Sequence, residues 1–291
     1  MSQGFFKLNI AWWNCGVSPP STAATPADID SAHLETITEL VETYSADIIA
    51  LCEVDLEDIE KITEHLNELY PDKFSTINLY RKSGNSIDDL FLIINSAKIK
   101  QTNEPERLNR KAPGTDNYLK AGYLVHLALY DGTPLWLTLS HWQSRRTYQT
   151  DTAVRELLGE ALRSSVEPIL SKHADPLIAL CGDFNDEPFS PSIQRLISSR
   201  DMNFVRRRSD TFFNPMWGLL GMDFLSDSGV VHGTYNGNAT HLSHKMTLDQ
   251  IMLSPGFLKN GWFFSEIGVT AVNHASASDH LPIVCQLQRI I

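Results

Sequence analysis

The chain has 291 residues, enough for one large domain with a sizeable core. Hydrophobic residues make up 42% and charged residues 20%, values that are typical of globular proteins. With 24 Lys and Arg against 35 Asp and Glu, the net charge is −11. This charge excludes a protein that holds nucleic acid through bulk positive charge, but not a nuclease with a local basic patch. We expect a single domain over residues 1–291.

The N-terminal sequence "MSQGFFKLNIAWW" does not have the basic region and long apolar segment of a signal peptide. The apolar runs are strand-sized, too short to span a membrane. Four cysteines, Cys15, Cys52, Cys181 and Cys285, lie far apart and without a CxxC pair. We therefore expect a cytoplasmic protein with buried free thiols and no stable membrane association; disulfides or a zinc site are the alternative.

The first part of the chain alternates strands and helices. The segments "FFKLNIAWWN" (5–14) and "ADIIALCEV" (46–54) are apolar and rich in β-branched or aromatic residues, which predicts buried strands. Apolar residues recur at helical spacing over 34–44 and again over 59–69, where Pro71 follows as a stop.

Closely spaced strands follow, separated by turn residues, and this spacing predicts antiparallel pairing. They are "FSTINLYR" (74–81), "DDLFLIIN" (88–95), "YLVHLALYD" (123–131) and "PLWLTLSHW" (134–142). A long helix is predicted from about Thr147 to Lys172, with Pro168 as a kink or boundary.

The last part begins with a predicted strand, "PLIALCGDFN" (176–185), and a short helix, "PSIQRLISS" (191–199). Residues 201–244 are loop-rich, and the ending is strand-like. The final strands are "MTLDQIMLS" (246–254), "FFSEIGVTAV" (263–272) and "LPIVCQLQ" (281–288). Strands that are apolar on both faces, with helices between some of them, predict an α/β (α+β) sandwich of two stacked sheets covered by helices.

Few polar residues interrupt or end these apolar strands. They are Asn14, Glu53, His141, Asp183, Asn185, Asp249, Asp279 and His280. Taken singly, each has a structural interpretation as a turn residue, a solvated strand end or a hydrogen-bonded histidine. Asp249 fits that interpretation least, because burying a carboxylate without a partner costs several kcal/mol, and His280 is the candidate partner.

Together, carboxylates, amides and two histidines at strand ends suit hydrolysis that is assisted by a hard cation. Carboxylate and carbonyl oxygens select Mg²⁺, Mn²⁺ or Ca²⁺. Zinc is less favoured, because the sequence has neither a thiolate cluster nor an HExxH motif.

The order of Asn14, "CEVD", "SHW", "GDFN", "LDQIMLS" and "SDHLP" resembles the endonuclease/exonuclease/phosphatase superfamily. That group includes DNase I-like nucleases, abasic-site endonucleases, neutral sphingomyelinases and inositol polyphosphate 5-phosphatases. The resemblance covers residues 8–287. It implies a four-layer α/β/β/α sandwich of two packed, mainly antiparallel sheets.

The resemblance also implies a metal site. Glu53 matches the principal Mg²⁺ ligand of the family, with Asn14 nearby and Asp279 able to contribute a second ligand. Mn²⁺ is a possible substitute for Mg²⁺. The bound metal is expected to act as a Lewis acid and template.

The "GDFN" segment matches the part of the family's site that handles the attacking water. Asp183 matches the carboxylate that orients or deprotonates this water. Asn185, two residues on in an extended segment, is expected to face the same way and to bind the phosphate. Asp186 and Glu187 are expected to cap the turn before the next helix.

Two histidines match phosphate-contacting positions of the family. His280 matches the residue that stabilises the pentacovalent phosphorus, and Asp249 matches the partner that orients it. His141 matches a second such histidine, which pairs with an acid on a preceding strand. Asp88 or Asp89 could be that acid, and a surface turn residue is the alternative interpretation of Asp89.

The substrate is the least determined property. Trp142, Arg145 and Arg146 follow His141 and could stack on a base and hold phosphates, or could form a solvated loop. "HWQSR" also looks like an HWPSR-type element of bacterial superfamily members, and the basic run at 206–208 is typical of a solvated surface.

The resulting hypothesis is a divalent-metal-dependent phosphodiester hydrolase. We expect a nuclease that cleaves DNA or RNA by in-line attack of an activated water. The alternative is a phosphatase or phosphodiesterase for a small-molecule, inositol or lipid phosphate ester. A binding module without activity is disfavoured, because every superfamily position that we identify is filled.

Overall fold

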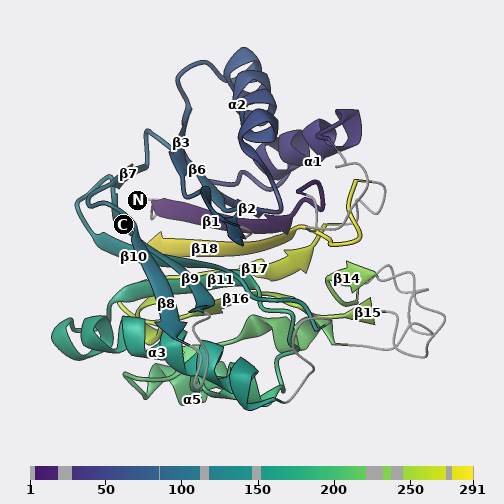
Figure 1. Cartoon of the computed structure of the whole chain (residues 1–291). Coiled ribbons are helices and arrows are strands. Elements are labelled where there is room, and N and C mark those ends of the chain that lie inside the picture. The colour runs from purple at the N-terminus through teal and green to yellow at the C-terminus, as the bar shows by residue number, and fades with distance from the viewer. Residues whose placement is uncertain are drawn as a thin grey trace.

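Two mixed β-sheets pack face to face, and helices cover both outer sides (Figure 1). The structure, a computed structural model, describes residues 4–18, 28–84, 86–111, 118–145, 152–220, 232–236, 245–272 and 277–290. The predicted four-layer α/β/β/α sandwich is confirmed.

The first sheet is built around β1, which pairs with strands from both ends of the chain. Its order is β17 (Trp262–Ala271), β18 (Ile283–Ile290), β1 (Phe5–Asn14), β2 (Ile48–Cys52), β6 (Phe91–Asn95) and β3 (Phe74–Asn78). β1 and β2 are parallel and the other pairs are antiparallel. The parallel pair needs a crossover, which contains α1 (Ser31–Glu42).

The second sheet repeats this plan with β10 and β11 as its central parallel pair, connected through α3 (Ala153–Lys172). Its order is β12 (Ser198–Ser199), β13 (Phe212–Phe213), β16 (Asp249–Leu253), β11 (Leu177–Asp183), β10 (Pro134–His141), β9 (Tyr118–Leu129) and β7 (Ile99–Gln101), with β8 (Glu106–Lys111) paired to β9.

Two short ribbons pair β4 (Arg81–Ser83) with β5 (Ser86–Asp88) and β14 (Tyr235–Asn236) with β15 (Lys245–Met246). The remaining helices are α2 (Leu56–Leu69), α4 (Pro191–Gln194), α5 (Met202–Arg206) and the 3₁₀ turns η1 (Pro215–Leu219) and η3 (Pro255–Leu258).

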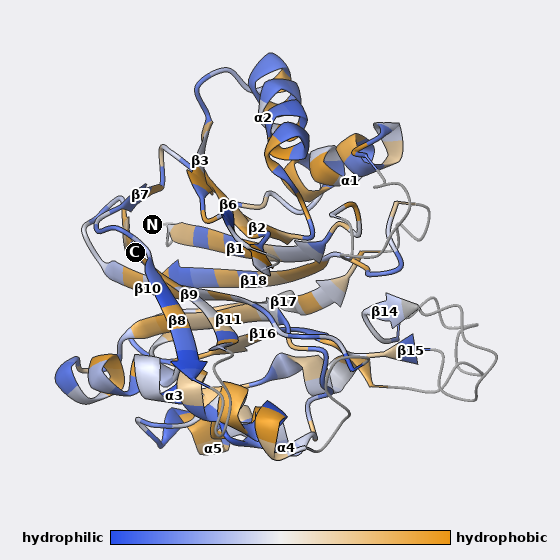
Figure 2. Ribbon diagram, viewed as in Figure 1, coloured by the Kyte–Doolittle hydropathy of each residue, from blue (hydrophilic) through white to orange (hydrophobic). Residues whose placement is uncertain are grey.

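Three apolar layers hold these elements together, which explains why the central strands are apolar on both faces. Successive side chains of a strand point to opposite faces, so Trp12 lies in the core between the sheets while Trp13 packs in the core beneath α1 and α2. A third core, which contains Leu162, joins α3 to the second sheet. Figure 2 shows hydrophobic residues along the strands of both sheets and a largely hydrophilic α2. Each large apolar side chain buried in this way contributes about 1.5–3 kcal/mol.

Helix boundaries follow local capping. Asp30 caps α1 and Asp55 caps α2, each by accepting hydrogen bonds from backbone N–H groups of the first turn. The long predicted helix is α3, but it runs through Pro168 to Lys172, so Pro168 is not its boundary. Residues 147–151 of that prediction lie outside the described residues.

The predicted state of the cysteines is confirmed: all four are free and buried. Within the part of the chain that the structure describes, no helix is long and apolar enough to cross a bilayer.

Candidate active site

Strand register brings the polar strand ends together at one edge of the sandwich. In the parallel pair β10–β11, His141 lies opposite Asp183, and in the antiparallel pair β11–β16, Asp183 lies opposite Asp249. In the other sheet, Asn14 at the end of β1 lies opposite Cys52 at the end of β2. The carboxyl ends of parallel strands share an edge, so both sheets present their polar ends to the same rim.

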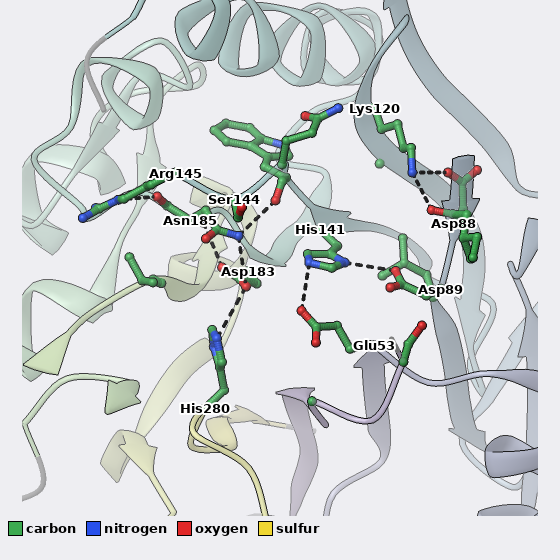
Figure 3. Close-up of a pocket in the computed structure, with 18 of the residues that line it drawn as sticks. Glu53, Asp88, Asp89, Lys120, His141, Ser144, Arg145, Asp183, Asn185 and His280 are labelled. Carbon is green, nitrogen blue, oxygen red and sulfur yellow. Dashed lines mark hydrogen bonds and ion pairs between the residues drawn. The ribbon is translucent and has the colours of Figure 1, made fainter. Parts of the chain in front are cut away.

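A cavity of about 700 Å³ opens at this rim. Its walls include the sequence-predicted site residues Glu53, His141, Asp183, Asn185, Asp279 and His280. Figure 3 shows His141 between Glu53 and Asp89, with Asp183, Asn185 and His280 on the neighbouring wall. Asn14 and Asp249 are 1% and 0% exposed, so they support the wall from behind.

Glu53 follows β2 in a left-handed backbone conformation with φ of 53°, which a non-glycine residue adopts at an energetic cost. The Asn14 amide nitrogen donates to Glu53 Oε1 and to Asp183 Oδ2, both at 3.1 Å, while its oxygen accepts from the Gly16 N–H. Burial alone would raise the pKa of Glu53, but hydrogen bonds from His141 and Asn14 hold it below its ordinary value. Glu53 is therefore an anion at neutral pH.

Asp279 is exposed and lines the same cavity as Glu53. The preceding residue, Ser278, donates from Oγ to the Asn14 carbonyl at 2.9 Å and fixes the segment against the end of β1. Gly16 allows this approach, because it has φ of 70° and a Cβ there would lie 3.1 Å from Ser278 Oγ.

His141 bridges two carboxylates. Its Nδ1 lies 3.0 Å from Asp89 Oδ1 and its Nε2 lies 3.3 Å from Glu53 Oε1. Burial alone would lower the pKa of His141, but these two carboxylates raise it well above its ordinary value. The acid that pairs with His141 is thus Asp89, and its interpretation as a surface turn residue is wrong. Asp88 points to a different cluster.

Asn185 reaches the cavity through a turn rather than through the predicted extended segment. It has φ of 51°, and its backbone N–H donates to Asp183 Oδ1 at 2.8 Å. Its amide nitrogen donates to the Trp142 carbonyl at 3.0 Å and to Asp183 Oδ2 at 3.2 Å. Burial raises the pKa of Asp183, the charge of Asp249 adds to this rise, and His280 opposes it.

His280 and Asp249 pair as predicted, with His280 Nδ1 at 2.8 Å from Asp249 Oδ2. The other oxygen of Asp249 accepts from Trp12 Nε1 at 2.9 Å. Burial alone would lower the pKa of His280, but the charges of Asp249 and Asp183 raise it to about 10. Ligand atoms of Asp183, Asp249 and His280 lie within 4.8 Å of one another, so this buried cluster has a geometry that could hold a metal ion.

The model of the Endonuclease/Exonuclease/phosphatase family matches residues 11–280, which include all eight of these strand-end residues. The chain belongs to this family. Its members are hydrolases of phosphate esters. A search of curated protein sequences gives no match.

Solved structures of the family share the fold over nearly the whole chain. The human Nocturnin catalytic domain with bound sulfate anion is 18% identical, with a TM-score of 0.62, and 98% of this chain and 97% of that chain are covered. An endonuclease/exonuclease/phosphatase family protein from Bacteroides thetaiotaomicron is 14% identical, with a TM-score of 0.64 and coverage of 100% and 98%. TDP2 of D. rerio, complexed with single strand DNA product, is 14% identical, with a TM-score of 0.58 and coverage of 97% and 98%. At these identities the likeness concerns the fold alone.

Three residues were predicted to bind substrate, and their positions in the structure differ. The Trp142 side chain is fully buried and packs edge-on against Phe184, so it is not placed to stack on a base. Arg145 lines the cavity, and its Nε donates to the Asn185 carbonyl at 2.8 Å. Arg146 lies outside the described residues.

Asp186 does not cap a turn, contrary to prediction. It is 1% exposed, and its Oδ2 accepts from Arg155 Nε at 2.6 Å, while Ser190 takes the N-cap position of α4. Arg155 also donates to the carbonyls of Gln143 and Phe184, both at 2.7 Å. No sequence pattern distinguishes Arg155 from the other charged residues of a helix. Among the described residues, the one hydrogen bond of Glu187 is made by its backbone carbonyl, which accepts from the Ser190 N–H.

The basic run at 206–208 is not part of the cavity lining. Arg206 Nε donates to the Leu258 carbonyl at 3.0 Å, and Arg208 pairs with Asp210 at 3.3 Å. These contacts are structural, so we assign this run no role at the site.

Proposed function

We propose that the chain is a divalent-metal-dependent phosphodiester hydrolase, and that it acts as a nuclease on DNA or RNA by in-line attack of water. One observation carries this proposal. Glu53, the Asp89–His141 pair, the Asp183–Asn185 turn and His280, which is held from behind by Asp249, face a single cavity at the rim of both sheets. The location that we propose is the cytoplasm, with the whole chain as one catalytic domain.

The donor chemistry fits Mg²⁺ or Mn²⁺. Glu53 and Asp279 offer carboxylate oxygens to the cavity, and hard divalent cations prefer such ligands. When bound, the metal would neutralise charge on the phosphate and polarise it. Asn14 turns its amide nitrogen to Glu53 and its oxygen to Gly16, so we assign it the positioning of Glu53 and Asp183.

We assign the Asp183–Asp249–His280 cluster to the reacting phosphate rather than to the metal. Both Asp249 oxygens already accept hydrogen bonds, one from Trp12 and one from His280. This arrangement fixes the His280 ring, whose Nε2 lies 3.8 Å from Asp183 Oδ2 at the cavity wall. His280 remains an imidazolium that can stabilise developing negative charge.

The attacking water is assigned to Asp183. Its raised pKa suits a group that accepts a proton, and Asn14 and Asn185 hold both of its oxygens in place. Asn185 would bind a phosphate oxygen, and His141 would do so from the neighbouring wall with Asp89 as its orienting partner.

Arg145 favours a substrate with further phosphates. The residue lines the cavity, and among the described residues its buried Nη2 has no hydrogen-bond partner, so the guanidinium retains a donor for a phosphate oxygen. The structure of TDP2 with a single strand DNA product adds support by analogy of fold. The second candidate is a small-molecule, inositol or lipid phosphate ester, which a cavity of about 700 Å³ has the size to accept.

A substrate panel tests the proposal. Wild type and Glu53→Gln would be assayed with Mg²⁺ or Mn²⁺ on plasmid, single-stranded DNA, RNA, a bis-aryl phosphodiester and inositol phosphates. We expect cleavage of nucleic acid by the wild type alone. Cleavage of inositol phosphates without nuclease activity would select the second candidate, and inactivity on every ester would reject both.

A further inference from the structure

Beyond the reacting centre, the cavity extends to a cationic corner formed by β5, β8 and β9. Arg107 on β8 and Lys120 on β9 line this corner together with Asp88 and Tyr123. In Figure 3 Lys120 and Asp88 lie on one side of His141, and Arg145 lies on the other side. None of the roles assigned above uses this corner.

The corner is built around one buried carboxylate. Asp88 is 5% exposed and accepts from Arg107 Nε at 2.6 Å, from Arg107 Nη2 at 3.0 Å and from the Tyr123 hydroxyl at 2.9 Å. Lys120 Nζ lies 3.4 Å from Asp88 Oδ1 and also donates to the Ile87 carbonyl. The four side chains therefore form a connected network that fixes both cations at the cavity wall.

This network has more positive than negative charge, so it can attract an anionic ligand. Two cations, Arg107 and Lys120, face the single carboxylate of Asp88, and exposed Arg81 lies opposite Asp88 in the β4–β5 pair. The adjacent Asp89 is paired with His141 and does not neutralise the corner. The side chains of Arg107 and Lys120 keep 24% and 28% of their surface exposed. Within the described residues, Lys120 donates one hydrogen bond, to the Ile87 carbonyl, and its contact with Asp88 is an ion pair, so N–H donors remain for a ligand.

We propose that this corner is a binding subsite for a second phosphate of the substrate, with Lys120 and Arg107 as its anion-contacting residues. The inference rests on the proposed function, because it takes the first phosphate to react between Glu53, His141 and Asp183. A substrate held in this way carries at least two phosphates. Its second phosphate could belong to the next nucleotide of a strand or to a phosphorylated small molecule.

The test compares Lys120→Gln with a matched control, Lys98→Gln. Lys98 makes the same kind of contacts, to buried Asp47 at 2.8 Å and to the Lys7 carbonyl at 3.1 Å, but it does not line the cavity. Both changes remove one charge from a similar setting, so differences between them report on the cavity. Lys120→Arg retains the charge and serves as the rescue variant.

The first readout is selectivity between substrates with one phosphate and with several. For Lys120→Gln we expect the ratio of kcat/KM on a short oligonucleotide to kcat/KM on a bis-aryl phosphodiester to fall about tenfold, equivalent to about 1.4 kcal/mol. Lys98→Gln and Lys120→Arg should keep the wild-type ratio within about twofold. An unchanged ratio in Lys120→Gln, or equal losses on both substrates, would overturn the subsite.

The second readout does not depend on catalysis. Binding of a phosphorothioate oligonucleotide and of inositol hexakisphosphate would be measured by calorimetry in EDTA at two salt concentrations. Lys120→Gln should weaken at least one of them about tenfold, and the ligand that is weakened identifies the source of the second phosphate. Weaker binding without any hydrolysis by the wild type would retain the subsite and reject the proposed function. Hydrolysis by the wild type, with ligand binding unaffected in Lys120→Gln, would retain the proposed function and reject the subsite.

Discussion

Arg155 and Asp186 form an ion pair that is closed off from solvent, with Nε and Oδ2 2.6 Å apart and side chains that are 0% and 1% exposed. The remaining donors of the same guanidinium hold the carbonyls of Gln143 and Phe184. One side chain of α3 therefore connects the loop after His141 to the loop after Asp183.

This pair predicts that Arg155 positions the site. Lysine cannot reproduce three directed contacts, so Arg155→Lys should lower kcat at least tenfold with little change in KM, and should also lower Tm. The control is Arg163→Lys on the same helix, where the native residue is 7% exposed and donates to the Asp210 carbonyl at 2.6 Å, away from the cavity. It should lower Tm with kcat unchanged. A loss of Tm without a loss of kcat in both variants would show that Arg155 is merely structural.

The proposed metal ligand gives the next prediction. Glu53→Gln should abolish activity and weaken Mn²⁺ binding, measured by calorimetry, because it removes an anionic ligand from the cavity wall. Glu60→Gln, a change at an exposed position of α2, should alter neither property. Full turnover of the wild type in excess EDTA would contradict the metal requirement. Unchanged Mn²⁺ affinity in Glu53→Gln with lost affinity in Asp249→Asn would move the metal to the buried cluster.

Asp183 and His280 should act as a unit. Asp183→Asn and His280→Ala should each slow hydrolysis by at least ~10²-fold, the usual size of general acid–base and electrostatic contributions. Because the two side chains face each other at 3.8 Å, the double variant should lose much less than the product of the single losses. Rate measurements under saturating substrate decide this, and multiplicative losses would reject the assignment.

Asp249 should affect both activity and stability. Asp249→Ala removes the acceptor of two buried donors, Trp12 Nε1 and His280 Nδ1, so the free energy of unfolding should fall by about 2–4 kcal/mol together with kcat. In Trp12→Phe the His280 contact remains, and a smaller loss of stability with most of the activity is expected. Denaturant unfolding and kcat of the two variants provide the comparison, and equal effects on kcat would show that orientation of His280 is unimportant.

Asp88 predicts a pH-dependent contribution to stability. Burial alone would raise the pKa of Asp88, but hydrogen bonds from Arg107 and Tyr123 and the charge of Lys120 hold it below its usual value. Its contribution is therefore present above the unfolded pKa of about 3.9 and is lost as the pH falls through the folded pKa. Asp88→Asn should cost about 2 kcal/mol at pH 7 and progressively less toward pH 2.5, measured by urea unfolding. Asp28→Asn at an exposed position should change the unfolding free energy by less than about 0.5 kcal/mol at either pH.

Residue patterns were sufficient to predict the sheets and the strand-end residues. Isolated polar residues at the ends of apolar strands can be recognised in the sequence. Because the carboxyl ends of parallel strands lie at the same edge of a sheet, these residues meet at one rim. The pairing of Asp249 with His280 also followed from sequence, because a carboxylate inside an apolar strand requires a partner.

Other contacts between distant segments could not be predicted from the sequence. Trp142 follows a rim residue but turns into the core beneath α3. Asp88 ends β5 and Asp89 begins the connection to β6, and the path of this connection decides which of the two faces His141. Asn185 adopts a left-handed backbone conformation, which asparagine tolerates but which its presence in the sequence does not predict. Each of these outcomes depends on tertiary packing rather than on spacing along the chain.

The central position of β1 has a consequence for synthesis. The indole of Trp12 bonds Asp249, and the Asn14 carbonyl accepts from Ser278, so the first strand is completed by groups more than 230 positions later. Until β18 leaves the ribosome, one edge of β1 is unpaired and the His280 wall does not exist. We expect a nascent or truncated chain that lacks β18 to associate through this exposed edge, and the proposed active site forms only when β18 joins the sheet.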